Sequence, residues 1–238
     1  LWQRVGINRD ATFPPQTLRM SGDEPVTLDP SLASDTDSIQ ILIQLFSGLI
    51  TLGHEMEILT NIASSWEVIG GGLKYIFHLR EDAVWSDSQP VTASDFEFAW
   101  KRVLDPATKS DNARLLEDVK GAQAFHQGQN TDPDQVGVHS LDDHTLMVEL
   151  EEPVSYFLYL LNRLATFPLP RHVVERYGDR WTEIQHLVTN GPYLLEAWHH
   201  GECLSFKRNP FCHDRFKGNV NQVEYFVGMG IPRAVRLY

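Results

Sequence analysis

The sequence predicts an α/β fold of the mixed α+β type, in which antiparallel hairpins are combined with helices. Three pairs of apolar, mostly period-two segments are each joined by a short polar or glycine-rich turn, as is typical of β-hairpins. Between these pairs lie segments with apolar residues at helical spacing, bounded by capping residues and prolines. With 238 residues, the chain is long enough for one large domain or two small ones.

The first predicted elements are a lead-in, a strand and a helix. Residues 1–17 form the lead-in, and residues 18–20 form a short strand before a turn-rich segment. Residues 39–49 carry a helical stripe of apolar side chains, namely Ile39, Leu42, Ile43, Phe46 and Leu49. We expect Asp37 or Ser38 to cap this helix, because either side chain can accept a bond from a free N–H of the first turn.

The middle of the chain predicts a hairpin and a capped helix. Residues 66–69 and 73–80 flank three glycines, and the second segment alternates in side-chain character. Thr92 and Asp95 have the spacing of a capping box, and Asp105-Pro106 would end the helix that they begin. Its predicted buried stripe consists of Phe96, Ala99, Trp100, Val103 and Leu104. Trp66, Trp85 and Trp100 are expected to be core residues.

The remaining segments predict two more hairpins. The first turns at Asp142-Asp143, and the second pairs residues 193–199 with residues 203–208. Two helices are expected near 154–164 and 171–177, and a last strand near 222–227.

Composition narrows the possible functions. The chain has 20 Lys and Arg against 32 Asp and Glu, a net charge of −12, which argues against a nucleic-acid surface. No stretch approaches the ~20 apolar residues of a membrane span, and no signal-peptide pattern is present in this chain. Cys203 and Cys212 either form one bridge or remain two thiols, and the sequence leaves both possibilities open.

No catalytic, cofactor-binding or metal-binding motif is recognisable. His199-His200 with Cys203, and Cys212-His213-Asp214, fit no zinc spacing. The glycines at 70–72 lack the helix and the Lys-Ser/Thr of a phosphate loop, and no nucleophile elbow occurs. We therefore expect no enzyme, no cofactor and no metal.

Several short motifs, in their order along the chain, resemble one known family. They are EPVTLDP at 24–30, LFSGL at 45–49, IASSWEV at 62–68, YIFHLR at 75–80, WSD at 85–87, PVTASDF at 90–96, LDDHTL at 141–146, FPLP at 167–170, YGDRW at 177–181 and TNGPY at 189–193. Together they resemble extracellular solute-binding protein family 5, the oligopeptide- and dipeptide-binding proteins of ABC importers. Each motif is weak alone, and their shared order makes the match specific.

The resemblance implies a periplasmic-binding-protein-like type II fold, of which this chain holds the first lobe with an inserted β-rich subdomain. Residues 18–47 and 166–238 would form the lobe I sheet region, and residues 48–165 the inserted subdomain. Residues 231–238 resemble the start of the crossover to the second lobe, which is absent from this chain.

The resemblance also implies a function. A family member captures oligopeptides or similar small solutes outside the cytoplasm, as a monomeric periplasmic protein or cell-surface lipoprotein, and delivers them to an ABC permease at the membrane. The alternative is the sensory ligand-binding domain of a larger regulatory protein, and the sequence leaves it open.

The resemblance places the ligand-facing positions in two loops. They are Ser34, Asp35 and Thr36 after the LDP motif, and Asp111 and Asn112 after the helix that begins near Thr92. This chain departs from the family in both loops: it has Ser-Asp-Asn-Ala at 110–113 where a tyrosine-bearing loop is expected, and a serine at position 34 where a carboxylate is expected. Asp35 could replace that carboxylate as the partner of a peptide ammonium group, or be a solvated loop acid. Specificity for peptides over other solutes stays open.

Overall fold

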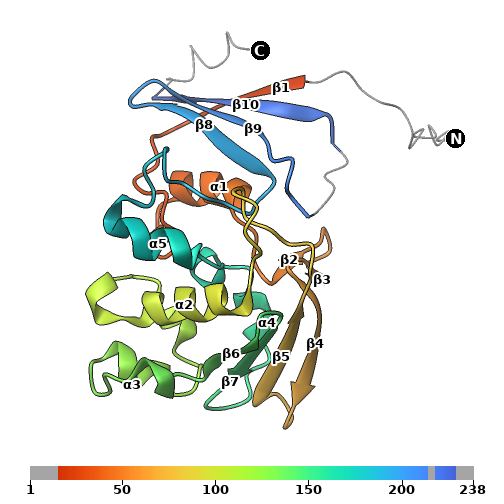
Figure 1. Cartoon of the computed structure of the whole chain (residues 1–238), viewed down its shortest axis with the longest axis vertical. Coiled ribbons are helices and arrows are strands. Elements are labelled where there is room, and N and C mark those ends of the chain that lie inside the picture. The colour runs from red at the N-terminus through yellow and green to blue at the C-terminus, as the bar shows by residue number, and fades with distance from the viewer. Residues whose placement is uncertain (1–15, 214–217, 229–238) are drawn as a thin grey trace, which may run out of the picture.

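The computed structural model describes residues 16–213 and 218–228 (Figure 1). They form two four-stranded sheets, here called the upper and the lower sheet, with helices between and beside them. Most of the predicted lead-in and the predicted crossover at 231–238 lie outside the described residues.

The upper sheet has the strand order β1-β10-β9-β8. Its members are β1 (Gln16–Gly22), β10 (Val220–Val227), β9 (Cys203–Arg208) and β8 (Tyr193–His199). The predicted last hairpin is confirmed, since β8 pairs antiparallel with β9, whereas β1 joins β10 in parallel across the length of the chain. Leu204, Phe206 and Tyr225 are buried on the face that lies over α1 (Thr36–Leu45).

Helix α1 differs from its prediction in its bounds, its cap and its buried face. It begins at Thr36, and Asp35 caps it by accepting a hydrogen bond from the Ser38 backbone N–H at 2.8 Å. The predicted caps Asp37 and Ser38 are therefore wrong. The Ser38 hydroxyl is buried and instead accepts bonds from the backbone N–H groups of Val26 and Thr27.

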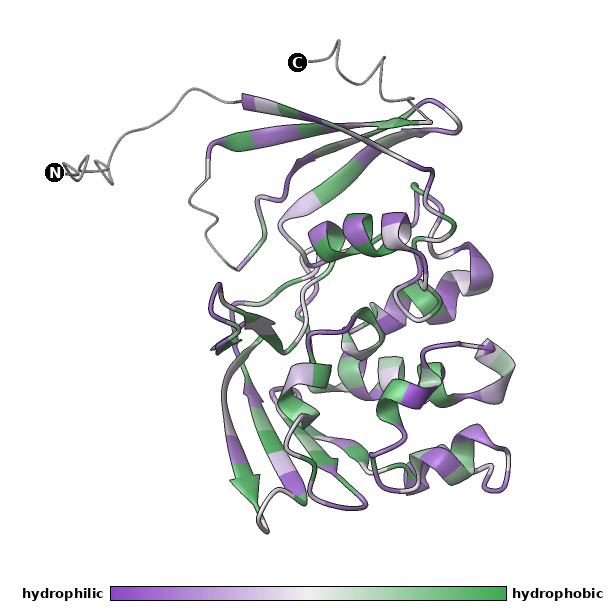
Figure 2. Ribbon diagram, turned by 180° about the vertical axis from the view of Figure 1, so that it is seen from behind, coloured by the Kyte–Doolittle hydropathy of each residue, from purple (hydrophilic) through white to green (hydrophobic). Residues whose placement is uncertain are grey.

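The buried face of α1 includes Ser38 and differs from the predicted apolar stripe. The buried side chains are Ser38, Ile41, Leu42 and Leu45. Ile39 and Ile43, which belong to the predicted apolar stripe, are 39% and 44% exposed. Phe46 and Leu49 are buried as expected but lie beyond the helix end. Figure 2 shows hydrophobic and hydrophilic residues interspersed along this helix.

The lower sheet is antiparallel, with the order β4-β5-β7-β6. Its members are β4 (Ala63–Ile69), β5 (Lys74–Leu79), β7 (Thr145–Glu149) and β6 (Val138–Asp142), so both predicted hairpins are confirmed. The turn between β4 and β5 needs its glycines, because residues 70, 71 and 72 all have positive φ. A small hairpin of β2 (Ile50–Leu52) and β3 (Ile58–Thr60), not predicted from the sequence, lies between the two sheets.

Helix α2 (Ala93–Leu104) packs on β6 and β7 and matches its prediction. The Asp95 carboxylate accepts a bond from the Thr92 backbone N–H at 2.9 Å, as a capping box requires. The same carboxylate accepts the Trp85 indole N–H at 3.1 Å. All members of the predicted stripe are buried, and the helix ends before Asp105-Pro106.

The other helices are short. They are α3 (Ala122–His126), α4 (Phe157–Leu160) and α5 (Arg171–Tyr177), with single 3₁₀ turns η1 (Pro106–Thr108), η2 (Ala113–Leu116), η3 (Pro133–Gln135), η4 (Leu164–Thr166) and η5 (Gly178–Arg180). The helix predicted at 154–164 was too long. After α4, the Thr166 hydroxyl donates to the carbonyl oxygens of Leu161 and Arg163.

Two of the three predicted core tryptophans are fully buried. Trp85 and Trp100 have no exposed surface, and the Trp100 indole N–H donates to the Thr166 carbonyl at 2.8 Å. Trp66 is only partly buried, and it lies on β4, an edge strand of the lower sheet in the order that the described residues form. Within residues 16–213 and 218–228, no helix has the length and apolarity that a membrane crossing needs.

We predict that Trp100→Ala lowers the free energy of unfolding by about 3–5 kcal/mol, since it leaves a large cavity and an unpaired carbonyl. Trp66→Ala is the matched control and should cost clearly less. Urea unfolding of both variants measures the difference. Equal losses would contradict the burial described for these two side chains.

Candidate functional site

The loop between β1 and α1 is fixed by one buried ion pair. Asp29 is 4% exposed, and its two carboxylate oxygens accept bonds from Nη1 and Nη2 of Arg102 on α2 at 3.1 and 2.7 Å. The Ser31 backbone N–H donates to the same carboxylate at 2.9 Å. Because a bidentate pair fixes orientation as well as distance, it holds this loop on the end of α2.

The second predicted loop reaches the same place. The Ser110 hydroxyl donates to the Ser31 carbonyl, and the Asn112 side-chain amide donates to the Ala33 carbonyl at 3.0 Å. The structure therefore brings the two predicted ligand loops together, although the bonded residues are 79 positions apart in both pairs. We call Asp29, Arg102, Ser110 and Asn112 the loop brace.

The five predicted ligand residues have different surroundings. Ser34, Thr36 and Asp111 are exposed, next to the brace. Asp35 is half-buried and caps α1, and Asn112 is half-buried within the brace. Two hydroxyls and a carboxylate thus point outward, where they can exchange hydrogen bonds with a solute or partner an ammonium group.

The sequence did not predict three members of the brace. Asp29 lies in the motif at 24–30, but nothing in the sequence pairs it with Arg102, which lies on the polar side of α2 and 73 positions away. Ser110 was noted only as part of a departure from the family. Trp181 was also missed as a partner: its indole N–H lies 3.4 Å from the Asp29 carboxylate. For Asp29, the only signal was the motif at 24–30.

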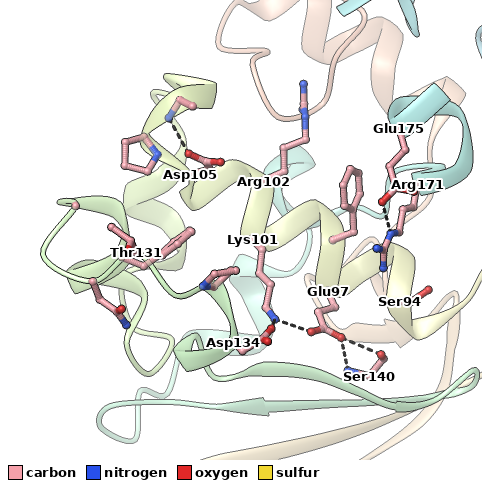
Figure 3. A pocket seen from close by; sticks show the side chains of 17 residues that line it. Ser94, Glu97, Lys101, Arg102, Asp105, Thr131, Asp134, Ser140, Arg171 and Glu175 are labelled. Atoms are coloured by element: carbon pink, nitrogen blue, oxygen red, sulfur yellow. Dashed lines mark hydrogen bonds and ion pairs between the residues drawn. The ribbon is translucent and has the colours of Figure 1, made fainter. Parts of the chain in front are cut away.

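A groove of about 900 Å³, here called the α2 groove, lies along α2 (Figure 3). In it, Lys101 contacts Glu97 at 2.6 Å and Asp134 at 3.0 Å, and Glu97 accepts two bonds from Ser140. Lys101 is thus paired with two carboxylates of the protein itself, and Glu97 is bound by Lys101 and Ser140. Arg102 lines the groove as well as the brace, whereas the five predicted ligand residues are absent from its lining. We therefore favour the braced loops over the α2 groove as the candidate site.

The part of the chain that the structure describes contains no cluster of three or more His, Cys, Asp or Glu side chains suited to a metal ion. No disulfide joins Cys203 to Cys212 in the structure.

Comparison with known families decides what the chain is related to. Residues 57–228 match the model described as bacterial extracellular solute-binding proteins, family 5 middle. The chain belongs to this family. The resemblance of the sequence motifs is thereby confirmed.

Curated members of family 5 are similar over most of this chain. The probable deoxycholate-binding periplasmic protein YgiS of Escherichia coli is 38% identical over 215 residues, which cover 89% of this chain and 40% of that protein. The periplasmic oligopeptide-binding protein OppA of Escherichia coli is 38% identical over 213 residues, with 88% and 39% covered. The chain thus spans about two fifths of the length of these relatives, with 40% and 39% of each covered.

Solved structures of family 5 proteins share the fold. The oligopeptide ABC transporter substrate-binding domain of Bacillus anthracis superposes with a TM-score of 0.90 at 35% identity, covering 94% of this chain and 43% of that one. OppA of Haemophilus influenzae, solved in complex with RPPGFSPFR, gives 0.86 at 33% identity, covering 91% and 43%. The predicted periplasmic-binding-protein-like fold is confirmed, while the boundaries of the inserted subdomain stay a prediction.

We predict that the main role of Asp35 is to cap α1. Asp35→Ala should lower the free energy of unfolding by about 1 kcal/mol, whereas Asp35→Asn, which keeps an acceptor, should cost much less. Urea unfolding at neutral pH tests this, and equal losses for the two variants would contradict the capping role.

The pH dependence of the same residue has a definite sign. Burial raises the pKa of Asp35, but hydrogen bonds from Ser38 and from the backbone of Asp35 and Asp37 together leave the pKa below its ordinary value of 3.8. A carboxyl group with a lowered pKa in the folded state adds stability above its ordinary pKa, and this stability is lost as the pH falls through the lowered value. The stability advantage of the wild type over Asp35→Asn should therefore shrink below pH 3.8, as unfolding at several pH values would show.

Proposed function

We propose that this chain supplies one wall of the solute site in a receptor of an ABC importer, which captures oligopeptides or similar small solutes outside the cytoplasm. The observation that carries the proposal is the pair of braced loops, which present Ser34, Thr36 and Asp111 to solvent in a member of family 5. The relatives described above are named for binding oligopeptides or deoxycholate, and none of them is named as a regulator. This supports the receptor over the sensory-domain alternative.

The proposed mechanism is noncovalent. A second lobe, in the part of the relatives' length that this chain does not span, closes on a solute held against the braced loops, and the closed receptor docks as a monomer on the permease. A loop that is already held in one conformation loses little freedom when it binds, so more of the contact energy becomes affinity. This mechanism requires no cofactor and forms no covalent bond.

The solute class is best tested with calorimetry on the full-length protein. We expect micromolar binding of a peptide such as trialanine or RPPGFSPFR. Deoxycholate is the second probe, because one relative is named for it. Binding of deoxycholate but of neither peptide would indicate that the solute is a bile acid. Binding of none of these probes would contradict the proposed function.

We predict that the 238-residue chain alone binds the same solute only weakly. If the two lobes share the contacts equally, a micromolar site of about −8 kcal/mol leaves about −4 kcal/mol to one lobe, which corresponds to millimolar affinity. Parallel titrations of the chain and of the full-length protein measure this difference. A micromolar constant for the chain alone would contradict a site shared between two lobes.

A further inference from the structure

The braced loop is supported from both ends. The backbone N–H groups of Leu32 and Ala33 both donate to the carbonyl of Asp29, at 3.0 and 3.1 Å, so the position of Asp29 sets the turn that follows it. Arg102 fixes Asp29 in turn through the bidentate pair. At the other end, Asp35 is fixed as the cap of α1.

Asn112 holds the middle of this loop. Its side-chain nitrogen lies 3.0 Å from the Ala33 carbonyl oxygen and 3.5 Å from that of Ser31. Ser34 therefore lies between Ala33, whose carbonyl is bound by Asn112, and Asp35, which caps α1. The direction in which the exposed Ser34 side chain points is set by these two neighbours rather than by contacts of its own.

We propose that Asn112 and Arg102 are positioning residues of the solute site: they set the geometry of residues 31–36 and do not themselves contact the solute. The inference rests on the proposed function and reassigns Asn112, which the family resemblance places among ligand-facing residues. Asp111, exposed between Ser110 and Asn112, keeps the ligand-facing role within its loop.

Chemistry favours this division of roles. For its side-chain amide to donate to a solute, Asn112 would have to release the Ala33 carbonyl, and a polar group left without a partner is costly. Arg102 is similarly committed, because leaving the buried Asp29 carboxylate unpaired costs more than most solute contacts return. Neither constraint applies to the exposed side chains of Ser34, Thr36 and Asp111.

The sharpest test is the isosteric variant Asn112→Asp in the full-length protein. It replaces a donor with an acceptor that faces the Ala33 carbonyl oxygen, so it should loosen the loop without changing its volume. We expect faster hydrogen exchange at the amides of residues 31–36 in the solute-free protein, and about tenfold weaker binding of trialanine or RPPGFSPFR. Asn221→Asp on β10 is the matched control and should change neither quantity.

A second variant keeps the inference testable if Asn112→Asp folds poorly. Arg102→Lys retains the charge but loses the planar fork, so it should give the same pair of changes. Weaker binding with unchanged exchange at residues 31–36 would indicate direct solute contact and overturn the proposal. Faster exchange with unchanged affinity, or no change in either quantity, would overturn it too.

The experiment distinguishes failure of the proposed function from failure of the loop brace. Exchange at residues 31–36 is measured without solute, so it tests the brace even if the wild-type protein binds neither peptide. In that case the absence of binding would overturn the proposed function and the positioning role with it, while accelerated exchange would still establish the mechanical brace.

Discussion

The arrangement of this molecule depends on the buried ion pair between Asp29 and Arg102. A buried carboxylate is unfavourable unless its charge and its lone pairs are satisfied, and here two guanidinium nitrogens and the Ser31 N–H do so. A pair of apolar side chains of the same volume could be as stable. It would not fix the loop in one orientation, because apolar contacts have no direction.

The same carboxylate begins a chain of contacts that crosses the core between the two sheets. The Trp181 indole N–H points to Asp29, and the Trp181 ring meets Phe46 edge-on at 6.3 Å. Phe46 meets Trp85 edge-on at 6.5 Å, and the Trp85 indole N–H donates to Asp95. Two buried carboxylates are thus connected through three aromatic rings. One carboxylate belongs to the loop before α1 and the other to the first turn of α2. The three rings between them therefore determine how these two segments pack together.

What the sequence predicted well was local. The capping box at Thr92, the stripe of α2 and the glycine turn at 70–72 follow from neighbouring residues, and the structure contains all three. What it missed depends on distant partners. The buried face of α1 is set by the need of the Val26 and Thr27 N–H groups for the Ser38 hydroxyl, and the brace joins residues more than 70 positions apart. The family resemblance pointed to the two loops, but only the geometry separates residues that hold the site from residues that face the solvent.

We propose that the solute lies against the braced loops and not in the α2 groove. Photocrosslinking with a diazirine-labelled RPPGFSPFR peptide on the full-length protein, followed by mass spectrometry, tests it most directly. We expect labels at residues 34–36 and at Asp111. Labels confined to the groove residues around Lys101 and Asp134 would contradict it.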